Sequence, residues 1–213
     1  SGGGSSGGSA NTAPTFGSTS GTVNVPENST LVGTFVATDT DSGDVLTYSL
    51  GGADQSQFTL NTATGLLSFK SAPNFEVDPK TYALQVIATD RASAVATKTL
   101  TINVTNVNEA PSISSASAAT VVENAAPSTV VYQTQTADPD ANDTLSYSLT
   151  GTDATLFEID AQGAVRLKAS ANFEAKSSYS VNVVATDAGG LSATRAVSVA
   201  VTNVNEAPNI SSA

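Results

Sequence analysis

The chain has 213 residues and a net charge of −11, because 19 Asp and Glu outnumber 8 Lys and Arg. This acidity argues against binding to nucleic acid or to anionic membrane surfaces, and it favours a cation as ligand. Cys and His are absent, which excludes a disulfide framework and the usual ligands of zinc, copper and iron, and leaves oxygen chemistry.

Repeated segments divide the chain. Residues 1–10 are Gly/Ser-rich, which is typical of a flexible linker or of a segment added for expression. The hexapeptide at 106–111, Asn-Val-Asn-Glu-Ala-Pro, returns letter for letter at 203–208, about the length of one β-sandwich domain later. This spacing predicts one repeat over 11–108 and a second over 109–208. Residues 209–213 resemble 112–116 and predict the start of a third repeat, so that the parent protein is longer.

Each half reads as a series of short strands. Alternation of apolar with polar or small residues is the pattern of a half-buried strand. It runs through residues 82–88 and 100–104 in the first half, and through 179–185 and 197–201 in the second. Residues 61–65 and 161–163 predict turns that need a glycine with positive φ. No stretch of 12 or more residues has a helical period. We therefore predict an all-β fold of two tandem, seven-stranded Greek-key sandwiches joined end to end.

Acidic residues cluster near the predicted strand ends. Because loops gather at the two poles of a sandwich, acids of the first repeat and of the linker should face acids of the second. Two carboxylates about 5 Å apart repel by roughly 3 kcal/mol at an effective dielectric of about 20, so a shared site needs cations. The six acids concerned are Glu27, Glu76, Glu109, Asp138, Asp140 and Asp187.

Seven short motifs recur in the same order in both halves, at nearly constant spacing. They are Glu-Asn, Asp-x-Asp, Tyr-Ser-Leu, Gly-x-Leu or Gly-x-Val, Phe-Glu, Ala-Thr-Asp and Asn-x-Asn-Glu-Ala-Pro, and they cover residues 12–208. This series resembles cadherin repeats in their bacterial, adhesin-associated form. The resemblance implies Greek-key sandwiches with up to three Ca²⁺ at each junction. It assigns as ligands Glu27, Glu76, Asn108, Glu109, Ala110 through its carbonyl, Asp138, Asp140 and Asp187.

Two positions depart from the family pattern. Asn74 and Asn106 stand where cadherins carry Asp, and we retain both as candidate ligands of lower charge. The loss of these charges predicts two to three Ca²⁺ at the junction. Weaker half-sites are expected at the outer poles of the pair, formed by Asn11, Ala13, Asp39, Asp41, Asp90, Glu123, Glu174 and Glu206.

The leading functional hypothesis is a calcium-rigidified extender or adhesion module of a larger bacterial adhesin, either secreted or on the cell surface. Its partners would be neighbouring repeats of the same chain and, as a further candidate, a cell-surface glycan or protein ligand. The expected state is a monomer or a weak calcium-dependent self-association. A calcium-dependent carbohydrate-binding or homophilic adhesion module is the alternative. Neither nucleic acid nor membrane insertion is expected, since no apolar run approaches the about 20 residues that span a bilayer.

An enzyme is disfavoured, because without His or Cys the usual nucleophilic triads have no base. Glu27 and Glu76 could be a glycosidase pair, but metal ligation would use both. Lys70 and Lys168 occupy matching predicted strands, which leaves an intramolecular Lys–Asn cross-link as a further possibility.

Overall fold

The computed structural model describes residues 10–208, and the expectations for residues 1–9 and for a third repeat at 209–213 lie outside them. The chain divides into two compact units, with the boundary between Val107 and Asn108. We call these units the first and the second repeat and describe each by itself.

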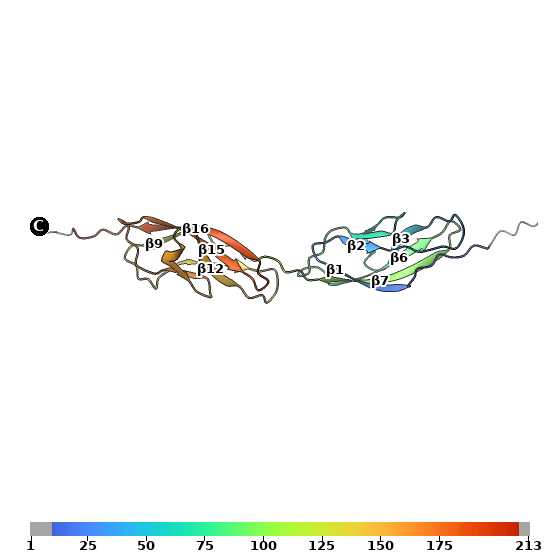
Figure 1. The fold of residues 1–213 in the computed structure, drawn as a ribbon, viewed down its shortest axis with the longest axis horizontal. Coiled ribbons are helices and arrows are strands. Elements are labelled where there is room, and N and C mark those ends of the chain that lie inside the picture. The colour runs from blue at the N-terminus through green and yellow to red at the C-terminus, as the bar shows by residue number, and fades with distance from the viewer. Residues whose placement is uncertain (1–9, 209–213) are drawn as a thin grey trace, which may run out of the picture. The chain divides into compact units, whose positions relative to one another are not determined.

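The first repeat is a sandwich of two sheets. Four strands pair in the order β1-β7-β6-β3 and three in the order β2-β5-β4 (Figure 1). The bounds are β1 (Ser20–Pro26), β2 (Leu31–Thr34), β3 (Thr47–Gly51), β4 (Phe58–Leu60), β5 (Leu66–Phe69), β6 (Thr81–Thr89) and β7 (Val95–Thr105). This order, with strands distant in sequence lying side by side, is the predicted Greek-key arrangement.

The second repeat has the same two sheets, and the Thr15–Thr38 bridge of the first repeat is extended there to a pair of two-residue strands. Its sheets run β12-β15-β16-β9 and β10-β14-β13, and a separate pair joins β11 to β8. The bounds are β8 (Ser112–Ile113), β9 (Ala118–Val122), β10 (Val130–Gln133), β11 (Thr136–Ala137), β12 (Ser146–Thr150), β13 (Phe157–Ile159), β14 (Ala164–Leu167), β15 (Ser178–Thr186) and β16 (Ser192–Thr202). The two-residue pair adds to the seven strands expected.

The long strands at either end of each repeat run parallel. In the first repeat β1 pairs with β7 from Ser20–Thr99 to Pro26–Thr105, and β9 pairs with β16 likewise. The chain therefore enters each repeat at one end and leaves at the other. We call these ends the N-terminal and the C-terminal pole.

Burial follows the predicted alternation. Tyr82, Leu84, Val86 and Ala88 of β6 are all buried, and the side chains between them are more exposed. Buried residues from both sheets form one cluster in each repeat. Burying one such Val or Leu side chain contributes about 1.5–3 kcal/mol, so the sheets hold together by this shared face.

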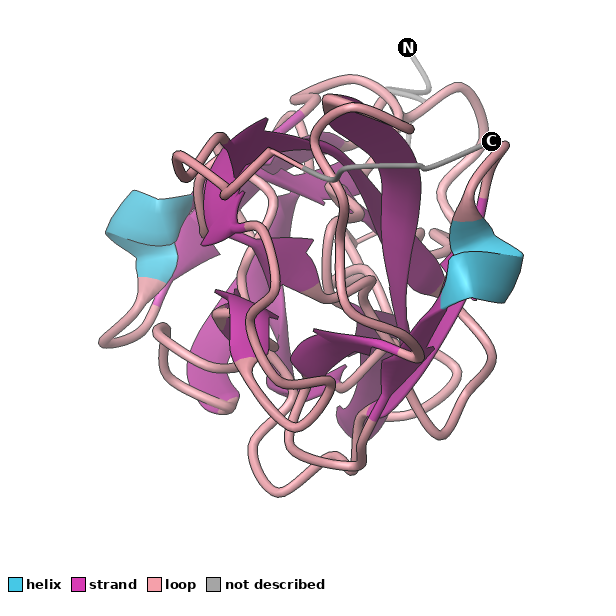
Figure 2. Ribbon diagram, turned by 90° about the vertical axis from the view of Figure 1, so that its left-hand side faces the viewer, coloured by secondary structure: helices cyan, strands magenta, loops and turns pink. Residues whose placement is uncertain are grey.

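Helix is confined to two single turns among the described residues, η1 (Gln55–Gln57) and η2 (Ala154–Leu156), drawn in cyan in Figure 2. The predicted turn glycines have positive φ, +69° at Gly65 and +74° at Gly163, as the sequence indicated. No helix of the described part could cross a bilayer.

Candidate metal centre

Glu27 ties together three segments at the C-terminal pole of the first repeat. It directly follows β1 and is only 2% exposed. One carboxylate oxygen accepts a hydrogen bond from the Phe75 amide at 2.8 Å, and the other accepts from the Val107 amide at 2.9 Å. Each oxygen retains lone pairs that a cation can use. Glu76 lies half-buried in the loop between Phe75 and β6.

Glu123 repeats this arrangement in the second repeat. Its carboxylate accepts from the Val204 amide at 2.6 Å and from the Phe173 amide at 3.0 Å. These two hydrogen bonds, that from Val204 foremost, hold the pKa of Glu123 below its usual value. The neighbouring Glu174 and Glu206 accept from the side-chain amides of Asn203 and Asn124.

At the N-terminal pole of the second repeat, three predicted aspartates lie near the first residues of that repeat. Asn108 donates from Nδ2 to Asp187 Oδ2 at 2.9 Å, and the Glu109 amide donates to Asp140 Oδ2 at 2.7 Å. Asp187 is 5% exposed because it continues the buried face of β15. Asp138 Oδ1 accepts from the Asp140 amide at 3.0 Å, which fixes the Asp-x-Asp turn.

The structure adds Asp143 to this pole, a residue that the sequence argument missed. Asp138, Asp143 and Asp187 each offer one carboxylate oxygen, and these atoms lie within 4.8 Å of one another. Asp143 is oriented by the Thr144 amide at 2.6 Å and by the Ala188 amide at 3.3 Å. The available signal was a third Asp, three residues after Asp-x-Asp in both repeats.

The N-terminal pole of the first repeat has the same construction. Asn11 Nδ2 donates to Asp90 Oδ2 at 2.9 Å, and the Thr12 amide donates to Asp41 Oδ2 at 2.6 Å. The Asn11 hydrogen bond is the main reason that the pKa of Asp90 lies below its usual value. Asp39, Asp41 and Asp44 bring carboxylate oxygens within 4.8 Å of one another.

The aspartate clusters have the properties of cation sites. Among the residues that the structure describes, the buried Oδ2 atoms of Asp39 and Asp138 lack a hydrogen-bond partner. An ionised oxygen buried without a partner is costly, and a cation removes that cost. Only oxygen donors are present, and Ca²⁺ takes 6–8 oxygen ligands in flexible geometry, whereas Mg²⁺ demands a tight octahedron. The residues present therefore fit Ca²⁺.

The positions of the other predicted ligands do not by themselves indicate a metal site. Asn74 Oδ1 accepts from the Val77 amide at 2.9 Å and so shapes a turn. Asn106, Ala13 and Ala110 lie on exposed segments. The two lysines considered for a cross-link instead donate to main-chain carbonyls, Lys70 to Ser56 at 2.6 Å and Lys168 to Thr155 at 2.9 Å.

Comparison with known proteins gives the family. The sequence model of the Cadherin domain matches residues 21–105 and 117–202, which is most of the chain. This chain belongs to the cadherin family. The prediction of cadherin repeats is thereby confirmed.

Similar cadherins are large animal proteins. Protein dachsous of Drosophila melanogaster is 32% identical over 196 residues, which are 85% of this chain and 6% of that protein. Protocadherin Fat 4 of Mus musculus is 33% identical over 81% of this chain and 4% of its own length. The chain thus spans less than a tenth of these relatives.

Solved cadherin structures share the fold. Human protocadherin-24 EC1-2 superimposes with a TM-score of 0.66 at 22% identity, covering 92% of this chain and all of that one. Mouse cadherin-23 EC22-24 gives 0.58 at 28% identity, covering 90% of this chain and 65% of the other. Cadherin repeats are non-enzymatic, extracellular adhesion-type modules that form tandem arrays and homophilic contacts and generally bind Ca²⁺.

Proposed function

We propose that this cadherin pair is a calcium-stiffened spacer, in which two or three Ca²⁺ bind where the first repeat passes into the second. The observation that carries the proposal is that two consecutive residues, Val107 and Asn108, are hydrogen-bonded to carboxylates of different repeats. Glu27 accepts from the amide of Val107, and Asn108, the next residue, donates to Asp187.

Chain connectivity supports a shared site. Consecutive Cα atoms are about 3.8 Å apart. The carboxylates of Glu27 and Asp187 are hydrogen-bonded to two consecutive residues, so covalent geometry limits the distance between them to a few times that spacing. Glu27 and Glu76 would serve from the first repeat and Glu109 from the linker. The aspartates at 138, 140, 143 and 187 would serve from the second. Asn108 would add its side-chain oxygen and Ala110 its carbonyl.

Charge balance supports the number of ions. The seven carboxylates named would carry seven negative charges into one region, and each close pair repels by about 3 kcal/mol. Two or three Ca²⁺ bring four to six positive charges and offset most of that repulsion. Each Ca²⁺ would hold oxygens of both repeats and so limit their relative motion, which is the physical content of stiffening.

In this proposal the pair is one segment of a longer surface or secreted adhesin of bacterial type, where it holds a distal binding domain away from the cell. Repeats that contact only their neighbours make a rod whose length grows with repeat number. The bacterial context rests on the resemblance of the repeated motifs to adhesin-associated cadherin repeats. Within such a rod the outer poles of this pair would be completed by further repeats.

Calorimetric titration with Ca²⁺ tests the proposal, with Asp140→Ala as the variant. We expect the unmutated chain to bind two or three Ca²⁺. The Asp140→Ala variant should lose at least one of these ions or bind with at least tenfold lower affinity. The reason is that Asp140 sits against the linker, where its Oδ2 accepts from the Glu109 amide.

Asp41→Ala is the matched control. Asp41 makes the equivalent contact at the outer pole, with the Thr12 amide, and should leave the junction ions unchanged. Unaltered circular dichroism would show that both sandwiches stay folded. If the Asp140 variant titrated like the parent, the junction site would be disproved.

A further inference from the structure

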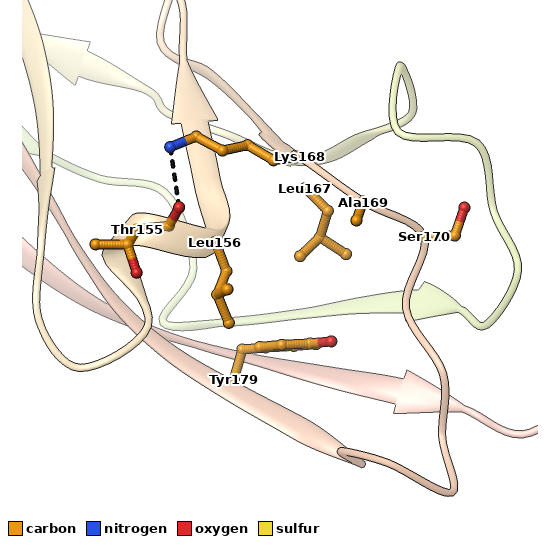
Figure 3. A pocket seen from close by; sticks show the side chains of 7 residues that line it. All are labelled: Thr155, Leu156, Leu167, Lys168, Ala169, Ser170 and Tyr179. Atoms are coloured by element: carbon orange, nitrogen blue, oxygen red, sulfur yellow. Dashed lines mark hydrogen bonds between the residues drawn. The ribbon is translucent and has the colours of Figure 1, made fainter.

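A small hollow opens on the second repeat, between η2, the residues that follow β14 and the start of β15. Its volume is about 130 Å³, and Figure 3 shows the Tyr179 ring facing Leu156 and Leu167 across it. Lys168 reaches over the rim, where its amine donates to the Thr155 carbonyl at 2.9 Å. The remaining lining residues are Ala169 and Ser170.

The first repeat has an aromatic residue, Phe69, at the position that corresponds to Leu167. Strand register equates the two sites, since Phe58 pairs with Phe69 and Phe157 pairs with Leu167. The Phe69 ring lies 4.4 Å from that of Phe58 and 5.2 Å from that of Tyr82, centroid to centroid. Among the described residues of the second repeat there is one such pair, Phe157 with Tyr179 at 5.4 Å. Leu167 therefore stands in place of one ring of a three-ring cluster.

We propose that this hollow binds a small aromatic carboxylate, a single ring bearing one negative charge. The ring would rest on Tyr179 between Leu156 and Leu167, and the carboxylate would meet the Lys168 amine. The residues that line the hollow include none of the candidate calcium ligands, so this proposal does not rest on calcium binding.

Size and shape favour one ring. An apolar cavity of about 150 Å³ in a protein interior takes up benzene, so a hollow of about 130 Å³ is matched to a single ring and too small for two. Aromatic rings prefer edge-to-face or offset contacts at about 4.5–7 Å, and the Phe69 cluster shows that this backbone supports that geometry.

Charge selects the anion. In a chain of net charge −11, the seven residues lining the hollow include Lys168 and no carboxylate. The ammonium group has three donors, and the Thr155 carbonyl uses one. A second cation, Lys176, stands 5.2 Å from the centre of the Tyr179 ring, although it is paired with Asp153.

Titration of the whole chain with sodium phenylacetate, followed by amide NMR spectra, tests the proposal. For so small a ligand we expect saturable shifts with a Kd of about 1–10 mM. They should be confined to residues 155–156, 167–170 and 179. The equivalent residues of the first repeat, 56–57, 69–72 and 82, serve as an internal control and should not move.

Two variants make the test decisive. Leu167→Phe installs the residue that the first repeat already accommodates and should weaken binding at least tenfold while the rest of the spectrum is unchanged. Lys168→Gln should retain ring binding but abolish the preference for phenylacetate over benzyl alcohol. The proposal is overturned if no saturable shift occurs, if both repeats respond equally, or if Lys168→Gln leaves that preference intact.

Discussion

At the scale of single residues, the two repeats serve as controls for one another. Gly65 and Gly163 occupy equivalent turns with similar φ, yet their surroundings differ. A Cβ at Gly65 would lie 2.2 Å from the Phe35 carbonyl oxygen, which is fixed backbone. A Cβ at Gly163 would lie 2.9 Å from the Thr134 Cβ, which is a milder overlap. The same substitution should therefore have unequal effects.

We expect Gly65→Ala to destabilise the first repeat by about 3 kcal/mol or more, since strain from positive φ adds to a backbone clash. Gly163→Ala should cost less, because the φ strain of about 1–2 kcal/mol is accompanied there by a milder overlap with the Thr134 Cβ. Chemical denaturation of each variant measures both. Equal losses would show that the contact at Phe35 is unimportant.

Asp160 gives a pH-dependent prediction remote from the metal sites. The Arg166 guanidinium, at 2.7 Å, is the main reason that the pKa of Asp160 lies below its ordinary value of 3.8, and turn amides add to this. A lowered folded-state pKa stabilises the fold above the unfolded-state pKa, and this stabilisation is lost as pH falls through the folded-state value.

Asp160→Asn should therefore be less stable than the unmutated protein near neutral pH, and the difference should shrink as pH falls below 3.8 and vanish below the lowered folded-state pKa. The first repeat supplies the rationale for the substitution. There Asn61 occupies the position and accepts from turn amides at 3.0 Å without a charge. Thermal midpoints of both proteins from pH 7 down to pH 2 measure the effect, and a constant difference across that range would contradict it.

At the scale of elements, a buried glutamate follows the first strand of each repeat, Glu27 in the first and Glu123 in the second. Its carboxylate accepts hydrogen bonds from a loop and from the segment that follows the last strand. Glu123→Gln places an NH₂ group against a backbone amide donor, either Val204 or Phe173, and so loses one of two hydrogen bonds. We expect a lower thermal midpoint for the second repeat, measured in chelator so that metal is not the cause.

Glu158→Gln is the matched control for that measurement, because Glu158 is exposed on β13. It should leave the midpoint unchanged. If both substitutions had the same small effect, the glutamate at the strand end would have no fastening role.

Strands were predictable where one face is buried over many residues. The alternation in residues 82–88 and 179–185 predicted β6 and β15, and its continuation placed Asp90 and Asp187 on the buried side. The β8–β11 pair was not predictable, since strands of two residues have no period. Asp143 was missed for a related reason. Its role depends on how a loop folds back beside Ala188, and that is a tertiary contact.

At the scale of the whole molecule, calcium should govern the reach of the pair. In the proposed spacer, carboxylates of the two repeats would repel one another without cations, and the repeats would then sample many relative orientations. We expect small-angle scattering to give a larger and better-defined maximum dimension in Ca²⁺ than in chelator. Asp140→Ala should reduce this response, and equal dimensions in both conditions for the parent would refute the spacer.

The parallel pairing of the first and last long strands has a mechanical consequence. A pull on the two ends of a repeat acts along β1 and β7 in opposite senses, so the bonds of the whole register from Ser20 to Pro26 are loaded together in shear. These hydrogen bonds therefore cannot break one at a time. The shorter register of the second repeat, from Ala118 to Val122, makes it the weaker link under tension.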